Sequence, residues 1–200
     1  MYLTKINLDQ KKKETAKAFS DHGRFHSLIE GCFSGERQHP LWRLESDAHS
    51  YSLLILSKDI PNLTPLESAV GRGDGRTIAY DQYLDSACRN ENVLRFRIAA
   101  NPIVTVNHAR VPLNIKRTAR YPHCAEDWLR NQLGKGGAEV LESTTTDNRT
   151  ISIKGGTGQL FKVTFEGTLK VIDQNKFRCL LEKGIGHGKA YGCGFLSVIA

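Results

Sequence analysis

The chain has 200 residues, which is enough for one large domain or two small domains of about 100 residues each. Hydrophobic residues make up 40% of the sequence and charged residues 24%, a composition that supports a packed core and excludes a disordered chain. The formal net charge of +7 favours a polyanionic partner, nucleic acid before membrane. No apolar run approaches the ~20 residues of a transmembrane helix, and residues 1–9 lack the apolar core of a signal peptide, so we expect a cytoplasmic protein with no membrane partner.

The five cysteines are odd in number and widely scattered, with no C-x-x-C pair. They indicate neither a disulfide framework nor a zinc site, and we interpret them as reduced, mostly buried thiols. Four histidines outside any motif also lack the spacing of a metal site: His39, His49, His108 and His123. We therefore expect neither a metal nor another cofactor.

The first half of the chain predicts the element order β-α-β-β-(α)-β. Alternating apolar residues predict a strand over residues 2–8, and the apolar spacing of residues 16–33 predicts a helix with Gly23 as a break. The other strands predicted here are residues 41–45, 51–57, 93–99 and 103–106. This order is that of a ferredoxin-like or RRM-like unit.

The second half of the chain again predicts a helix with antiparallel strands. A basic linker, residues 116–120, precedes a predicted helix over residues 125–133, and a second short helix is predicted over residues 175–183. A turn over residues 155–158 should join two of the strands. The predicted strands are residues 138–145, 150–154, 161–171 and 195–199.

The densest motif of the chain is its glycine-rich end, residues 184–194. Five glycines fall within eleven residues, together with His187, Lys189 and Tyr191, and a strand-like apolar tail follows. Glycine accepts positive φ and allows a close approach of another backbone, so the run suggests a loop shaped to lie against phosphate. It lacks the order G-x-x-x-x-G-K-[ST], and a strand follows it in place of a long helix, which argues against a nucleotide-binding P-loop.

Four segments together resemble the CasE family of CRISPR repeat endoribonucleases from type I-E systems. They are residues 1–5 (MYLTK), 42–45 (WRLE), 96–102 (FRIAANP) and the glycine-rich run 184–194, and they occur in the same order as in that family. The resemblance covers nearly the whole chain. It implies metal-independent cleavage of precursor CRISPR RNA at the repeat hairpin, by attack of the 2′-OH that leaves a 2′,3′-cyclic phosphate. It also implies that the enzyme stays on the hairpin as a subunit of the Cascade complex, with the backbone subunit as its expected neighbour.

The predicted fold class is α+β, with two tandem ferredoxin-like (RRM-like) domains and antiparallel sheets. Residues 1–112 form the predicted N-terminal domain, which carries the catalytic helix. Residues 113–200 form the predicted C-terminal domain, with the basic hairpin and the glycine-rich loop.

The candidate catalytic residues lie in the first predicted helix. RNA cleavage by the 2′-OH needs proton carriers, for which histidine is suited, and a cation for the phosphorane charge. The family's catalytic histidine falls at this point of the helix, which implies His26 as the general acid or base. Many members carry a tyrosine three residues earlier, where this chain has Gly23, so His22 could supply a second proton carrier. Arg24, on the same helical turn, or a lysine could stabilise the phosphorane charge. Which histidine is acid and which is base stays open.

The candidate RNA-binding residues are cations in loops and hairpins. Arg95 and Arg97, which share one strand face, either lie under RNA or pair with acidic neighbours. The residues expected to bind RNA belong to the basic linker, the second-half hairpin and the glycine-rich loop: Lys116, Arg117, Arg120, Arg149, Lys154, His187 and Lys189.

Two other functions are compatible with the sequence. A non-catalytic RNA stem-loop-binding module would bind the repeat and never cut it. A small α+β interaction subunit would use its basic charge on an acidic protein, and would lack the salt-sensitive RNA affinity that phosphate neutralisation produces.

Overall fold

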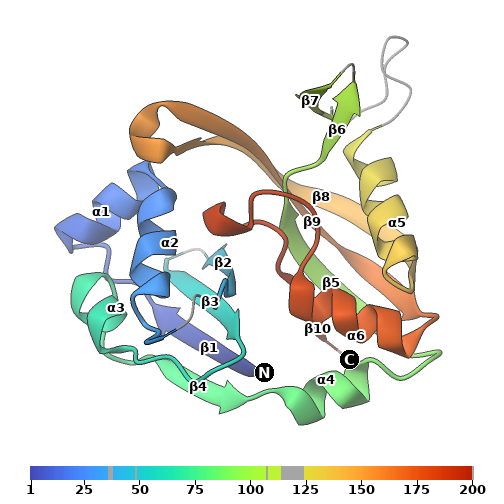
Figure 1. The fold of residues 1–200 in the computed structure, drawn as a ribbon, viewed down its shortest axis with the longest axis horizontal. Coiled ribbons are helices and arrows are strands. Elements are labelled where there is room, and N and C mark those ends of the chain that lie inside the picture. Colours follow the sequence, from blue (N-terminus) through green and yellow to red (C-terminus); the bar gives the residue numbers. More distant parts are fainter. Residues whose placement is uncertain (36–37, 48, 107, 114–123, 200) are drawn as a thin grey trace. The chain divides into compact units, whose positions relative to one another are not determined.

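The computed structural model describes residues 1–35, 38–47, 49–106, 108–113 and 124–199, which form two compact units (Figure 1). Unit 1 comprises Met1–Gln82, Ile151–Leu160 and Lys189–Gly192, and unit 2 comprises the rest of the described chain. The helices are α1 (Lys13–Ser20), α2 (Gly23–Glu30), α3 (Thr64–Ala69), α4 (Asp81–Ala87), α5 (Ala125–Lys135) and α6 (Gln174–Lys183). The strands are β1 (Tyr2–Asn7), β2 (Leu41–Ser46), β3 (Tyr51–Ser57), β4 (Arg76–Ala79), β5 (Val93–Ala100), β6 (Ile103–Val106), β7 (Ala109–Pro112), β8 (Ala138–Ile153), β9 (Gly158–Val171) and β10 (Leu196–Ile199). Two short 3₁₀ turns, Lys154–Gly156 and Lys189–Tyr191, complete the elements. Among the described residues, no helix has both the length and the apolar character needed to cross a bilayer.

Unit 1 contains a four-stranded antiparallel sheet in the order β2-β3-β1-β4. The central strand β1 pairs with β3 and β4, and Thr4 lies opposite Ile55 and Thr77. Alternation along β1 buries Thr4 and Ile6 and exposes Lys5, as the period of two requires. Together with the helices between the strands, this is the βαββαβ order and strand arrangement of a ferredoxin-like domain.

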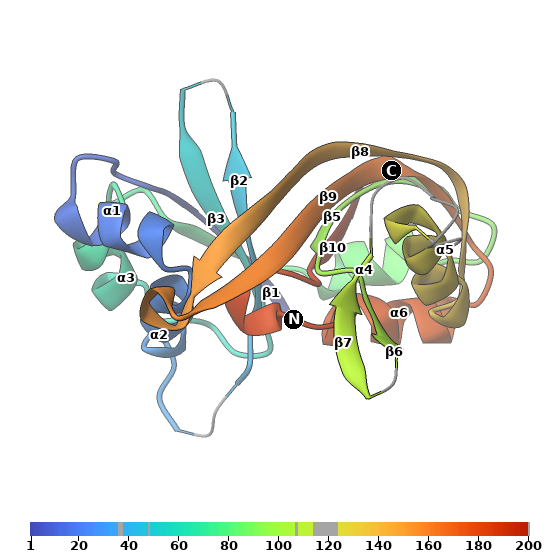
Figure 2. The same cartoon turned by 90° about the horizontal axis from the view of Figure 1, so that it is seen from above.

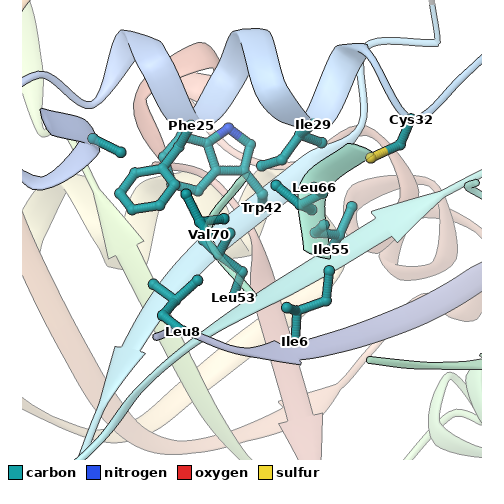
Figure 3. Packing of buried hydrophobic residues seen from close by; sticks show 11 residues of the cluster. Ile6, Leu8, Phe25, Ile29, Cys32, Trp42, Leu53, Ile55, Leu66 and Val70 are labelled. Atoms are coloured by element: carbon teal, nitrogen blue, oxygen red, sulfur yellow. The ribbon is translucent and has the colours of Figure 1, made fainter. Parts of the chain in front are cut away.

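The core of unit 1 lies between helices α1 to α3 and one face of this sheet (Figure 3). Phe25 and Ile29 of α2 and the Trp42 side chain of β2 have no exposed surface. The Phe25 and Trp42 rings lie with their centroids 5.7 Å apart. Because Phe25 and Ile29 are four residues apart, they share one helix face, and the opposite face of α2 stays available for polar residues.

The helix predicted over residues 16–33 is two helices, α1 and α2. The break falls at Asp21, whose backbone is extended, with φ −141° and ψ 102°. The Asp21 carboxylate accepts a hydrogen bond from the Gly23 N–H at 3.0 Å, so it satisfies a free donor in the first turn of α2. The predicted break near Gly23 is therefore confirmed, and α2 begins at that glycine.

Unit 2 contains the second antiparallel sheet, in the order β10-β5-β9-β8. With α5 and α6 between its strands, it repeats the ferredoxin-like arrangement, so the predicted fold class is confirmed. Asp173 caps α6 by accepting hydrogen bonds from the N–H groups of Asn175 and Lys176. Strands β8 and β9 lie side by side (Figure 2), and their turn, Lys154–Gly156, begins one residue before the predicted range of 155–158.

Three details differ from the sequence-based interpretation. Residues 93–99 were assigned to a first domain ending at residue 112, but β5 is the first strand of the second sheet, and the compact units divide after Gln82. The fourth strand of the first sheet is instead β4, which is only four residues long and mostly exposed, so it lacks an apolar pattern. The strands predicted over residues 138–145 and 150–154 form the single 16-residue strand β8.

Candidate active site

Three segments distant in sequence meet in unit 1, at the junction of α1 and α2. Asp21 links the junction to the β8–β9 turn, because its second carboxylate oxygen accepts a hydrogen bond from the Gly155 N–H at 2.8 Å. The His22 N–H also donates to the Ser152 carbonyl oxygen, at 3.4 Å. The third segment is Lys189–Gly192 of the glycine-rich run, which lies against α2 and β2.

His26 lies on α2, one turn after His22, and its side chain is 19% exposed. Its Nδ1 is 4.0 Å from Oε1 of Glu30, one turn further along the same helix face. A histidine in this setting lies beside a carboxylate and is still partly exposed to a ligand, which suits a general acid or base. The position assigned to His26 from the sequence is therefore a suitable one.

His22 occupies a different environment, because its ring is buried. Nδ1 is 3.4 Å from the Tyr191 carbonyl oxygen, and the ring centroid lies 6.1 Å from that of Phe25 and 6.2 Å from that of Trp42. A carbonyl oxygen only accepts, so this contact requires a proton on Nδ1. His22 is thus placed to hold the glycine-rich segment against the core.

Arg24 is directed away from His26. The two residues are two positions apart, about 200° around the helix axis. The Arg24 guanidinium instead lies 3.6 Å from the Glu14 carboxylate of α1, and both side chains are largely exposed. The structure does not bring Arg24 together with His26.

Gly192 lets the glycine-rich segment approach β2 closely. Its φ is +78°, and a Cβ at this position would lie 2.7 Å from Cζ3 of Trp42. In the same segment, partial burial lowers the pKa of the Lys189 amine from its ordinary value. A phosphate beside Lys189 would offset this desolvation by pairing with the ammonium group.

The other predicted RNA-binding residues are dispersed. Arg149 pairs with Asp147 at 2.9 Å, and half of the arginine side chain is exposed. His187 is exposed, and its backbone forms an isolated bridge with Asn101 in unit 2. Lys154 opens the β8–β9 turn, but its side chain lies outside the described part of the chain, as do Lys116, Arg117 and Arg120.

Arg95 and Arg97 lie on the outer face of the second sheet, beside a hollow of about 540 Å³. Arg97 Nε is 3.3 Å from the Glu166 carboxylate, opposite it on β9. Of the two interpretations left open by the sequence, pairing with an acidic neighbour therefore holds for Arg97.

The sequence did not identify Asp21 and Tyr191 as parts of this site. Asp21 is an ordinary turn residue by composition, and its contact with Gly155 spans 134 positions. Tyr191 stands inside the glycine-rich run, which was the available signal, but the run alone does not indicate which helix it meets. No group of three or more His, Cys, Asp or Glu side chains placed for a metal ion occurs among the described residues.

The fold and this site define an α+β protein of two tandem ferredoxin-like domains, with a histidine-bearing helix beside a glycine-rich segment. The chain belongs to the CRISPR-associated protein family, whose family model matches residues 1–200. The resemblance found in the sequence is thereby confirmed.

Relatives of known name agree with this assignment. The CRISPR-associated endoribonuclease Cse3 of Thermus thermophilus is 27% identical over 217 residues, which cover 99% of both chains. The CRISPR system Cascade subunit CasE of Escherichia coli is 36% identical over 114 residues, which cover 52% of this chain and 57% of the relative. The structure of Thermus thermophilus Cse3 bound to an RNA representing a pre-cleavage complex superimposes with a TM-score of 0.85. That match has 25% identity and covers 100% of this chain and 98% of the other.

Proposed function

We propose that the protein is a metal-independent endoribonuclease that cleaves precursor CRISPR RNA at the repeat stem-loop. The observation that carries the proposal is the position of His26, held beside Glu30 on the helix where the β8–β9 turn and the glycine-rich segment meet. The relatives named as endoribonucleases, and the RNA complex of one of them, support the choice of substrate.

The reaction transfers a phosphodiester within the RNA. The 2′-oxygen forms a new bond to phosphorus while the bond from phosphorus to the 5′-oxygen breaks, which yields a 2′,3′-cyclic phosphate and a 5′-hydroxyl. One group takes the proton of the 2′-OH, and another gives a proton to the leaving 5′-oxygen. His26 performs one of these transfers. The Glu30 carboxylate, 4.0 Å from Nδ1, would stabilise the ring when it carries the extra proton.

RNA binding in this proposal rests on cations of the glycine-rich segment and of the β8–β9 hairpin. Lys189 of the glycine-rich segment and Lys154 of the β8–β9 turn belong to unit 1, and Arg149 precedes that turn on β8. A-form stems are recognised mostly by shape and by phosphate contacts, which suits such an arrangement. The protein then stays on the hairpin as a Cascade subunit next to the backbone subunit, in keeping with the name of the Escherichia coli relative.

His26→Ala tests the proposal in a single-turnover assay with the repeat RNA of the host's own array, with EDTA present. Wild type should cut the repeat and leave a 2′,3′-cyclic phosphate end, while the variant binds with similar affinity and cuts about 10²–10⁴-fold more slowly. His49→Ala is the matched control, because that histidine is exposed in the β2–β3 turn and should be dispensable. Wild type that binds the repeat and never cuts it would instead establish the non-catalytic RNA-binding module.

A further inference from the structure

The Tyr191 ring lies beside Gly23, the position at which α2 has no side chain. Gly23 and His26 are three residues apart and therefore lie on one face of the helix, one turn from each other. A Cβ at Gly23 would lie 3.7 Å from Cε1 of Tyr191, which is ordinary van der Waals contact. The tyrosine ring from the glycine-rich segment thus fills the space beside Gly23, next to the turn that carries His26.

Two contacts position the backbone of Tyr191. Its carbonyl oxygen faces Nδ1 of the buried His22 at 3.4 Å, and the next residue, Gly192, packs against Trp42. The side chain itself is only partly buried. Its hydroxyl has no hydrogen-bond partner among the described residues, whereas the Tyr83 hydroxyl donates to the Val198 carbonyl at 2.8 Å. A held phenol with an unused donor is suited to a ligand.

We infer that the Tyr191 hydroxyl is a catalytic group that donates a hydrogen bond to a non-bridging oxygen of the scissile phosphate. This inference rests on the proposed function and adds a second residue to it. Negative charge builds on those oxygens as the 2′-oxygen attacks, so a donor fixed beforehand stabilises the transition state more than the bound substrate. No proton leaves the phenol in this role, and the proton transfers remain with other groups.

Tyr191→Phe is the central test, because it keeps the ring against Gly23 and removes only the hydroxyl. Single-turnover cleavage of the repeat RNA should slow by about 10–100-fold, the loss expected for one hydrogen bond to a charged group. The Kd for repeat RNA with a 2′-deoxy nucleotide at the cleavage site, which cannot be cut, should change by less than about 3-fold. Tyr51→Phe, which removes a phenol hydroxyl from β3 in the same unit, should cut at the wild-type rate.

A sulfur substitution in the RNA separates a contact with phosphate from a packing role. Wild type should cut one phosphorothioate stereoisomer at the scissile phosphate more slowly than the other, and Tyr191→Phe should lose most of that difference. Tyr191→Leu, which also removes the ring, should cut no faster than Tyr191→Phe. The inference is overturned if Tyr191→Phe cuts like wild type, including the case in which only Tyr191→Leu is slow. If wild type binds the repeat without cutting it, the proposed function fails as well, and the wild-type assay alone distinguishes the two failures.

Discussion

Gly192 determines how closely the glycine-rich segment can lie to the core of unit 1. Its positive φ is a conformation that glycine adopts freely and other residues adopt at a cost. Trp42, the side chain it contacts, is fully buried between β2 and α2 and cannot move aside. Both restrictions act on the same residue, so a side chain here should be costly to the fold.

We expect Gly192→Ala to lower the free energy of unfolding by about 2–4 kcal/mol, because backbone strain and overpacking add. The matched control is Gly73→Ala, since Gly73 has a similar φ of +83° but no atom within 4 Å of a Cβ. The control should lose only the strain, about 1–2 kcal/mol. Urea unfolding followed by tryptophan fluorescence measures both, and equal losses in the two variants would contradict the role given to Trp42.

At the scale of single residues, the sequence indicates which residue types suit the chemistry, but not which residues they contact in the folded protein. His26 is a candidate because histidine chemistry and a family motif mark its position. The contact between His22 and Tyr191 could not be predicted, because it joins residues 169 positions apart. The opposite directions of Arg24 and His26 follow from helix geometry once the bounds of α2 are known.

Among the elements, the β8–β9 turn is linked to the start of α2 by the side chain of Asp21. Asp21 accepts hydrogen bonds from Gly23 at the start of α2 and from Gly155 in the turn. The turn has two glycines with positive φ, Gly155 and Gly156. Because glycine has many accessible conformations, contacts with other segments are needed to restrict such a turn. The position of a predicted RNA-binding turn is therefore set partly by an acidic residue.

Asp21→Ala should make the turn more mobile and cost about 1–2 kcal/mol of stability, the value of one or two such hydrogen bonds. Hydrogen–deuterium exchange followed by mass spectrometry should show faster exchange in a peptide spanning residues 151–160. Asp47→Ala is the control, because Asp47 accepts the same kind of hydrogen bonds, from His49 and Ser50, within the β2–β3 turn. If residues 151–160 exchange equally fast in both variants and in wild type, Asp21 does not hold the turn.

The elements that the sequence predicted well have strong apolar periodicity. β5 alternates buried apolar with exposed residues and was found, whereas β4, with the sequence Arg-Thr-Ile-Ala, has no buried residue to mark it. The sequence predicted a helix after the third strand only as an optional element without bounds. Helix α3 carries Pro65 in its first turn, where proline is well tolerated. Missing β4 moved β5 into the wrong sheet, so one short strand accounts for the misplaced domain boundary.

For the molecule as a whole, the sequence indicated reduced and buried cysteines, and the structure supports the burial for most of them. Cys32 in unit 1 and Cys88 and Cys193 in unit 2 are each at most 4% exposed. Burial raises the pKa of all three thiols to about 11, because the thiolate loses its hydration. Both units therefore contain thiols for which the folded protein favours the neutral form over the thiolate.

Raised thiol pKa values make the folded protein less stable as the pH rises. A thiol with a raised pKa in the folded state stabilises the protein fully below its ordinary pKa of 9.0, and this stabilisation is lost as the pH rises towards about 11. We expect the free energy of unfolding to fall between about pH 9 and pH 11, in both units. Urea unfolding at pH 7.5, 9 and 10.5 measures it, with Trp42 in unit 1 and Trp128 in unit 2 as the two fluorescent reporters.

Lysines and tyrosines also titrate in this range, so the control must remove only the thiols. The triple variant Cys32→Ala, Cys88→Ala and Cys193→Ala should start less stable at pH 7.5, because alanine fills less of each buried site. Its further loss between pH 9 and 10.5 should be smaller than that of wild type, since no buried thiol remains to ionise at those three positions. An equal loss in the two proteins would assign the alkaline instability to other groups.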